Sequence, residues 1–290
     1  LSKTELDVEL IFLVAFIAAG STILCLSAST ICNEFSIVDR IWSVLPIIYN
    51  LMFIAYPVIR YEEDLNPRLL ITTTIITIWG LRLTFNFWRK GGYSPDGEDY
   101  RWKYVREEMI PNRVLLFLFN VFFISFYQNL LIVLFSAPGY YIFLNRNKEF
   151  GYTEYLILVL MIAFLVGEAK SDQQQWDFQK EKKRLKSQKK LIEPYLTGFL
   201  KSGLFKYSRH PNFFCEFMFW WSFYLLSCIH DGGYINFTGL GALLLNLLML
   251  GSTDLTEKLT LRKYEEYKVY QTEVNRLIPW FSRITKTKSE

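Results

Sequence analysis

The chain has 290 residues, of which 51% are hydrophobic and 18% aromatic, while its formal net charge is only +4. The apolar residues gather in runs of about 20, the length that crosses a bilayer core, instead of recurring periodically as in a soluble domain. The small net charge and the lack of interleaved basic and aromatic residues argue against a nucleic-acid partner. The sequence therefore predicts an all-α, polytopic transmembrane helical bundle whose surroundings are membrane lipids.

The four cysteines and two histidines give no support for a metal site. Cys25, Cys32, Cys215 and Cys228 show no CxxC spacing, and no His or Cys cluster with ligand spacing is present. We therefore expect no bound metal and interpret the cysteines as buried small apolar side chains, three of them within the membrane segments.

About seven membrane spans are predicted, with boundaries uncertain by several residues. They cover residues 8–30, 41–59, 69–88, 114–136, 153–169, 212–229 and 234–252. The segment between 137 and 152 is expected to form a turn and a short interfacial piece. The tail 254–280 is charged and helical in composition, and it ends at Pro279. With no repeat and no low-complexity linker, residues 1–290 are predicted to form a single transmembrane domain.

The distribution of Lys and Arg predicts the orientation of these spans. Cations are dense in the connections 89–113 and 169–211 and in the tail, and sparse in 60–68, 145–152 and 230–233. An excess of Lys and Arg marks the side that is not translocated. The tail and residues 201–211 are therefore expected on one cytosolic or matrix face of an integral membrane protein.

The most informative segment is 201–221, KSGLFKYSRHPNFFCEFMFWW. Pro211 is suited to the first position of a helix, and the free amide groups of a helix N-terminus beside Arg209 favour an anion. Asn212 and Glu216 are four residues apart and share a helical face. A carboxylate within an apolar segment indicates function by default. The alternative is a helix cap followed by one acid that reaches the membrane surface.

Two further groups of polar residues occur near the beginning of the predicted span 41–59 and within the predicted span 69–88. Asp39 and Trp42 lie at the mouth of the former, either as ligand contacts or as a helix-terminal acid and an interfacial tryptophan. Arg82 lies inside the latter, where it either binds an anion or reaches back to the surface. In the loop that follows, Asp99 and Arg101 either cover a cofactor or belong to an amphipathic surface helix.

A polar stripe leaves the membrane after the span 153–169. Glu168, Asp172, Gln175 and Gln179 recur at helical spacing, as groups that bind ribose or adenine would. In the tail, Tyr267 either packs on the mouth of the bundle or caps a ligand.

Taken together, these motifs resemble the DUF1295 branch of the steroid 5-alpha-reductase C-terminal superfamily. The resemblance runs from about Asp39 to the tail. It rests on VDRIW, WGLRL followed by GEDYRW, EAKSDQQQWDF, SGLFKYSRHPNFFCEFMFWW and EKLTLRKYEEYKVYQ with RLIPWF. The block with His-Pro-Asn is the most specific of these motifs.

The resemblance implies a steroid-reductase-like bundle that binds NADPH at its cytosolic mouth. Such a protein reduces a carbon–carbon double bond in a sterol, steroid or other lipid held between the helices. The residues implied to bind the cofactor are Asp172, Arg209, His210 and Asn212, with Arg82, Arg101 and Tyr267 as secondary candidates. Glu216 is the candidate catalytic residue, expected near the nicotinamide.

Two departures from the family pattern support a different hypothesis. Asp177 and Gln179 stand where the family typically has two cations, and without those cations NADPH binding is weakened. The second hypothesis is therefore that the chain is a catalytically degenerate accessory subunit of a large membrane complex. A mitochondrial respiratory complex is one such assembly. The third hypothesis is an S-adenosylmethionine-dependent membrane methyltransferase, because some related proteins that carry an Arg-His-Pro turn are methyltransferases of this kind. The expected location is either the endoplasmic reticulum membrane or the mitochondrial inner membrane.

Overall fold

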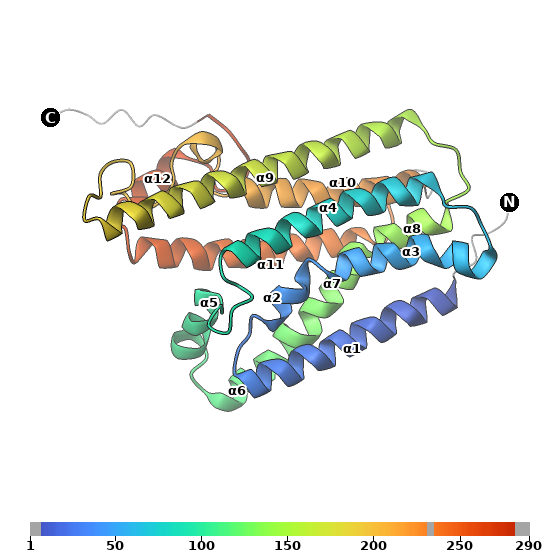
Figure 1. Ribbon diagram of the computed structural model, residues 1–290, viewed down its shortest axis with the longest axis horizontal. Coiled ribbons are helices and arrows are strands. Elements are labelled where there is room, and N and C mark those ends of the chain that lie inside the picture. Colours follow the sequence, from blue (N-terminus) through green and yellow to red (C-terminus); the bar gives the residue numbers. More distant parts are fainter. Residues whose placement is uncertain (1–6, 231–234, 282–290) are drawn as a thin grey trace. The chain divides into compact units, whose positions relative to one another are not determined.

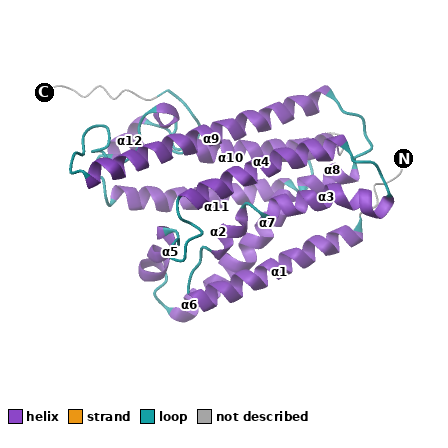
Figure 2. Cartoon of the chain, viewed as in Figure 1, coloured by secondary structure: helices purple, strands orange, loops and turns teal. Residues whose placement is uncertain are grey.

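The computed structural model describes residues 7–230 and 235–281, and every regular element within these ranges is a helix (Figures 1 and 2). The contacts of the chain gather in two compact units. Unit 1 comprises residues 1–161 and 220–245, and unit 2 comprises residues 162–219 and 246–290.

Unit 1 holds the elements from the N-terminus to the beginning of α9. They are α1 (Val8–Cys32), α2 (Ile37–Trp42), α3 (Leu45–Tyr61), α4 (Pro67–Arg89), α5 (Tyr100–Tyr104), the π-helical turns η1 (Val105–Met109) and η2 (Asn120–Tyr127), α6 (Arg113–Phe119), α7 (Gln128–Ser136) and α8 (Pro138–Leu144). Unit 2 holds the 3₁₀ turn η3 (Gly203–Lys206) and α12 (Tyr267–Glu273). The helices α9 (Tyr152–Ser187), α10 (Pro211–His230) and α11 (Gly239–Leu261) contribute residues to both units.

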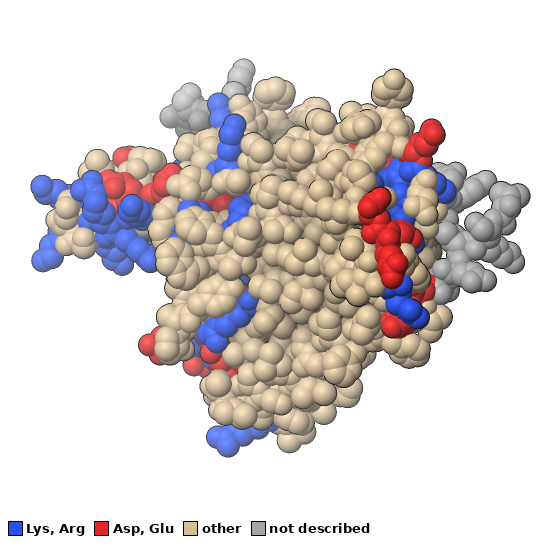
Figure 3. Space-filling model, turned by 45° about the vertical axis from the view of Figure 1, so that its right-hand side comes forward, with Lys and Arg blue, Asp and Glu red and all other residues tan. Residues whose placement is uncertain are grey.

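Six helical segments in the described ranges are long and apolar enough to cross a membrane, which confirms an integral membrane protein of the all-α class. They are Val8–Cys32, Ile37–Tyr61, Pro67–Arg89, Arg113–Leu144, Tyr152–Ser187 and Gly239–Leu261. The predicted span 212–229 corresponds to α10, which begins at Pro211 as expected but is not among the six. Asn212, Glu216 and its tryptophans lower its hydropathy. On the face drawn in Figure 3, wide areas carry no charged side chain, and acidic and basic residues gather in clusters.

The C-terminal boundaries differ from those predicted. The span predicted at 234–252 is α11, which begins at Gly239 and continues to Leu261; residues 231–234 lie outside the described ranges. The tail predicted as helical over 254–280 is helical only to Leu261 and again over α12. After Glu273 the backbone becomes extended at Val274.

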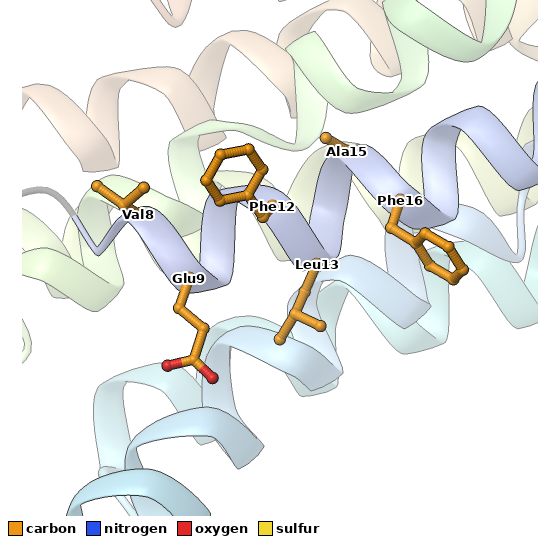
Figure 4. Close-up of a pocket in the computed structure, with 6 residues that line it drawn as sticks. All are labelled: Val8, Glu9, Phe12, Leu13, Ala15 and Phe16. Atoms are coloured by element: carbon orange, nitrogen blue, oxygen red, sulfur yellow. The ribbon is translucent and has the colours of Figure 1, made fainter.

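Helix α1 packs against the rest of unit 1 mainly through small residues. Its buried residues are Leu10, Ser21, Cys25 and Ser29, so three of the four recur at a spacing of four on one face. Small side chains let membrane helices approach closely, and here the Asn120 side-chain amide donates to Ser29 Oγ at 2.8 Å. Most of the exposed side chains of α1 are apolar, and Figure 4 shows Val8, Phe12, Leu13 and Phe16 near its beginning together with the Glu9 carboxylate.

A second close contact joins α4 to the segment before it. A Cβ atom at Gly80 would lie 2.5 Å from the Ser43 carbonyl oxygen and 2.6 Å from the Ile47 side chain. The hydroxyls of Ser43 and Thr84 are hydrogen-bonded at 2.6 Å. Gly80 therefore allows a backbone approach that no other residue permits.

A buried ion pair fastens the loop between α8 and α9. Arg68 and Glu154 are 2% and 1% exposed, and Arg68 Nε donates to Glu154 Oε1 at 2.9 Å. The Arg68 guanidinium also donates to the carbonyls of Asn145 and Glu149. Nearby, hydrogen bonds from Arg146 hold the pKa of Glu63 below its usual range. The pairing of Arg68 with Glu154 was not predicted from the sequence.

We predict that Gly80→Ala destabilises the protein by about 1–3 kcal/mol, because the added methyl group meets backbone and a packed isoleucine. Thermal unfolding in detergent measures the effect. Gly20→Ala is the matched control, since a Cβ at that helical position meets nothing within 4 Å. An equal response of the two variants would contradict the close approach at Gly80.

Candidate functional site

The Arg209 side chain in unit 2 binds a carboxylate of the same chain. Arg209 Nε donates to Glu257 Oε1 at 2.8 Å, and Nη2 donates to Oε2 at 3.1 Å. Nη1 donates to the carbonyl oxygens of Gln271 and Val274 at 2.9 and 2.6 Å. Both charged side chains are 9% exposed. These contacts use four of the five N–H groups of a guanidinium, and the Tyr267 hydroxyl is a further hydrogen-bond partner of Arg209.

Three other side chains converge on Glu257. His210 Nε2 lies 2.8 Å from Glu257 Oε1, and Gln271 Nε2 donates to Oε2 at 2.6 Å. Tyr267 is buried beside this group, and burial together with the Glu257 charge raises the pKa of its hydroxyl. Of the predicted cofactor residues, the structure therefore brings Arg209, His210 and Tyr267 together around one internal anion. We call Arg209, His210, Glu257 and Gln271 the Glu257 cluster.

Backbone hydrogen bonds extend this cluster along the tail. The N–H groups of Arg209 and His210 donate to the carbonyls of Asn275 and Arg276 at 2.9 and 3.1 Å. Ser208 Oγ donates to the Leu277 carbonyl at 2.7 Å. The residues immediately before α10 are thus tied to the extended part of the tail, which explains why that part is not helical.

Arg276 fixes the same part of the tail to α11. Its guanidinium donates to the Leu250 carbonyl and pairs with Asp254 at 2.8 Å. Its Nε donates to Thr253 Oγ1 at 3.0 Å. The tail therefore has two independent charged attachments within unit 2.

Two carboxylates of unit 2 are buried where α9 and α10 approach closely. A Cβ at Gly167 would lie 2.7 Å from Cys215 Sγ, and Glu168 and Glu216 are the next residues of the two helices. Their exposed fractions are 2% and 6%. Burying carboxylates in apolar helices is costly unless they have polar partners. The predicted catalytic residue, Glu216, is thus buried next to the close approach of α9 and α10.

The other predicted residues of α9 and α10 are more accessible. Asp172 and Asn212 are half-buried, as is Gln179. Asp177 is exposed, and its carboxylate accepts a hydrogen bond from Gln173 at 2.8 Å. Accessible carboxylate and amide groups fit the hydroxyl and amine groups of a nucleoside.

A lysine that could replace the missing cations already has partners. Lys182 Nζ donates to the Gly198 carbonyl at 2.6 Å and to the Tyr264 hydroxyl at 2.9 Å. Gly198 has φ +82, and a Cβ there would lie 2.1 Å from the Tyr264 ring. Lys182 therefore holds the turn at Gly198 against Tyr264.

The remaining predicted residues, Arg82 and Arg101, belong to unit 1. Arg101 Nε donates to Asp99 Oδ1 at 2.8 Å. Burial raises the pKa of Asp99, but the bonds from Arg101 outweigh it and leave that pKa lowered. Asp39 accepts a hydrogen bond from Trp102 Nε1 at 3.0 Å, so the VDRIW and GEDYRW motifs contact each other. Arg82 is half-buried in α4.

Sequence reasoning missed Glu257 and Gln271. Both belong to the closing motif EKLTLRKYEEYKVYQ, in which only Tyr267 was singled out as a candidate. The available signal was that a buried Arg-His pair requires a carboxylate partner. The tail offers several acids, and the pattern alone does not distinguish them.

Comparison with known proteins gives one family and one curated relative. The model of a family described as a protein of unknown function, DUF1295, matches residues 26–274. An uncharacterized protein of Schizosaccharomyces pombe is 38% identical over 250 residues, which cover 83% of this chain and 72% of that protein. No solved structure matches the chain significantly.

We predict that Glu257→Gln destabilises the protein by about 3–5 kcal/mol, because it leaves the buried Arg209 charge without a counter-ion. Thermal unfolding in detergent measures the loss. Glu265→Gln, at an exposed acid of the same tail, is expected to change stability by no more than about 0.5 kcal/mol. Similar values for the two variants would contradict a structural role for the Glu257 cluster.

Proposed function

The chain belongs to the DUF1295 family, and from that membership we propose that it is a membrane-embedded, NADPH-dependent reductase of a carbon–carbon double bond in a lipid or sterol-like substrate. The observation that carries the proposal is the pair of buried carboxylates, Glu168 and Glu216, on the helices that also present Asp172 and Asn212. Helices that only anchor a protein in lipid do not require such groups.

The residues of unit 2 fit the nucleoside part of a dinucleotide well. The Asp172 carboxylate accepts hydrogen bonds from ribose hydroxyls, and the Asn212 amide both donates and accepts. For the phosphates, Arg209 offers little, because its contacts with Glu257 and two carbonyls use four of its five N–H groups and Tyr267 is a further partner. Arg209 thus serves mainly as a positioning residue, which gives it a smaller role in phosphate binding than the resemblance implies.

The chemistry requires two additions across the double bond. When bound, NADPH supplies the hydride to one carbon, and a proton must be added to the other. Glu216 is the proposed group near the nicotinamide, where its carboxylate orients the carboxamide. The burial of Glu216 limits the access of water to its carboxylate, and a hydrogen bond made there is stronger than one made in water.

A second candidate function is supported by the charges of the same unit. Arg209 is already paired with Glu257, and Asp177 and Gln179 replace two expected cations. A site with so little positive charge suits a chain that has lost cofactor binding and serves as an accessory subunit of a membrane complex.

We predict that the purified protein binds NADPH with a sub-millimolar Kd and that Asn212→Ala weakens binding about tenfold, the value of one lost hydrogen bond. Equilibrium titration with NADPH, NADH and S-adenosylmethionine measures this. Asn147→Ala, at an exposed loop residue of unit 1, is the matched control.

The other outcomes of that titration separate the hypotheses. Binding of S-adenosylmethionine alone would support a methyltransferase instead. If no ligand binds and the protein co-purifies in a large assembly, the reductase proposal is wrong and the accessory role is favoured.

A further inference from the structure

The end of the described tail carries an exposed group of large apolar side chains. Ile278, Trp280 and Phe281 are 66%, 64% and 78% exposed, and Tyr207 next to them is 38% exposed. The rings of Tyr207 and Phe281 meet edge to face at 6.1 Å. We call these four residues the aromatic patch. Large apolar side chains that gather on a surface indicate a contact with another phase or molecule.

The patch is held in place by the backbone. Trp280 N–H donates to the Tyr207 carbonyl at 2.9 Å, and Ser208 Oγ donates to the Leu277 carbonyl at 2.7 Å. The Arg209 and His210 amide bonds to the tail lie directly beside these contacts. The exposure of the patch is therefore set by the fold of unit 2.

The position of the patch fits the edge of a membrane. Tyr207 lies four residues before Pro211, the first residue of α10, whose sequence is rich in Phe, Trp and Leu. Tryptophan and tyrosine gather at the two interfaces of a bilayer, where an amphipathic ring meets both acyl chains and water. A patch that immediately precedes such an apolar helix is expected at the level of the lipid headgroups.

Two exposed lysines precede the patch in the chain. Lys201 and Lys206 lie in the turn that leads to Tyr207. Lysines beside interfacial aromatic residues are attracted to anionic lipids.

From these observations we infer that the aromatic patch and its lysines form a binding surface for the headgroups of anionic phospholipids in the bilayer that holds the chain. The aromatic side chains enter the interfacial layer, and Lys201 and Lys206 bind the lipid phosphate and carboxylate groups. This inference does not depend on the proposed reductase activity. The aromatic patch would hold the beginning of α10 and the end of the tail at the membrane surface whether or not the protein is an enzyme.

Quenching of Trp280 fluorescence in reconstituted vesicles tests the inference. The difference in emission between the wild type and Trp280→Phe isolates this residue. The quenchers are phosphatidylserine or phosphatidylcholine with bromine atoms near the headgroup, each mixed into unlabelled phosphatidylcholine. We expect brominated phosphatidylserine to quench Trp280 at a lower mole fraction than brominated phosphatidylcholine does.

Charge variants test the role of the lysines. Lys201→Gln and Lys206→Gln are each expected to reduce the preference for phosphatidylserine about fivefold. Lys268→Gln, at an exposed lysine of α12, should leave it unchanged. Aqueous iodide gives the opposing readout: strong quenching by iodide without quenching by either lipid would overturn the inference. Protection from both quenchers would also overturn it, because a second copy or another protein would then cover the patch.

Discussion

The Glu257 carboxylate is the group on which the arrangement of unit 2 depends. It accepts hydrogen bonds from Arg209 and Gln271 and contacts His210, and so joins the beginning of α10, the end of α11 and the tail. A buried guanidinium needs a partner of opposite charge, and removing that partner leaves an uncompensated charge in an apolar setting. The most specific block of the family thus has a structural task as well as any role in binding a ligand.

The partner of Arg209 could not be identified from the sequence. The free amides of a helix N-terminus beside Arg209 predicted a bound anion, whereas in the structure the Arg209 side chain pairs with a carboxylate of the chain itself, 48 residues away. Local patterns indicate what a segment requires, whereas the partner depends on tertiary contacts between distant segments. Whether a phosphate group also approaches Arg209 stays a proposal.

The helical class and most spans were predictable because a bilayer demands long apolar helices. Pro211 was correctly placed at a helix start for an equally local reason. The extended course of the tail after Glu273 was not predictable from its helical composition, since backbone bonds from Arg209 and His210 determine it. The burial of Arg68 with Glu154 was also not predictable, because it too depends on a contact between segments that are distant in the sequence.

A double-mutant cycle between Arg209 and Glu257 tests the central claim most directly. The free energy of unfolding is measured for the wild type, Arg209→Gln, Glu257→Gln and the double variant. If the two side chains hold the tail together, the coupling energy is about 1.5–3 kcal/mol, and the double variant loses less stability than the sum of the single ones. A coupling energy near zero would show that the pair does not organise unit 2.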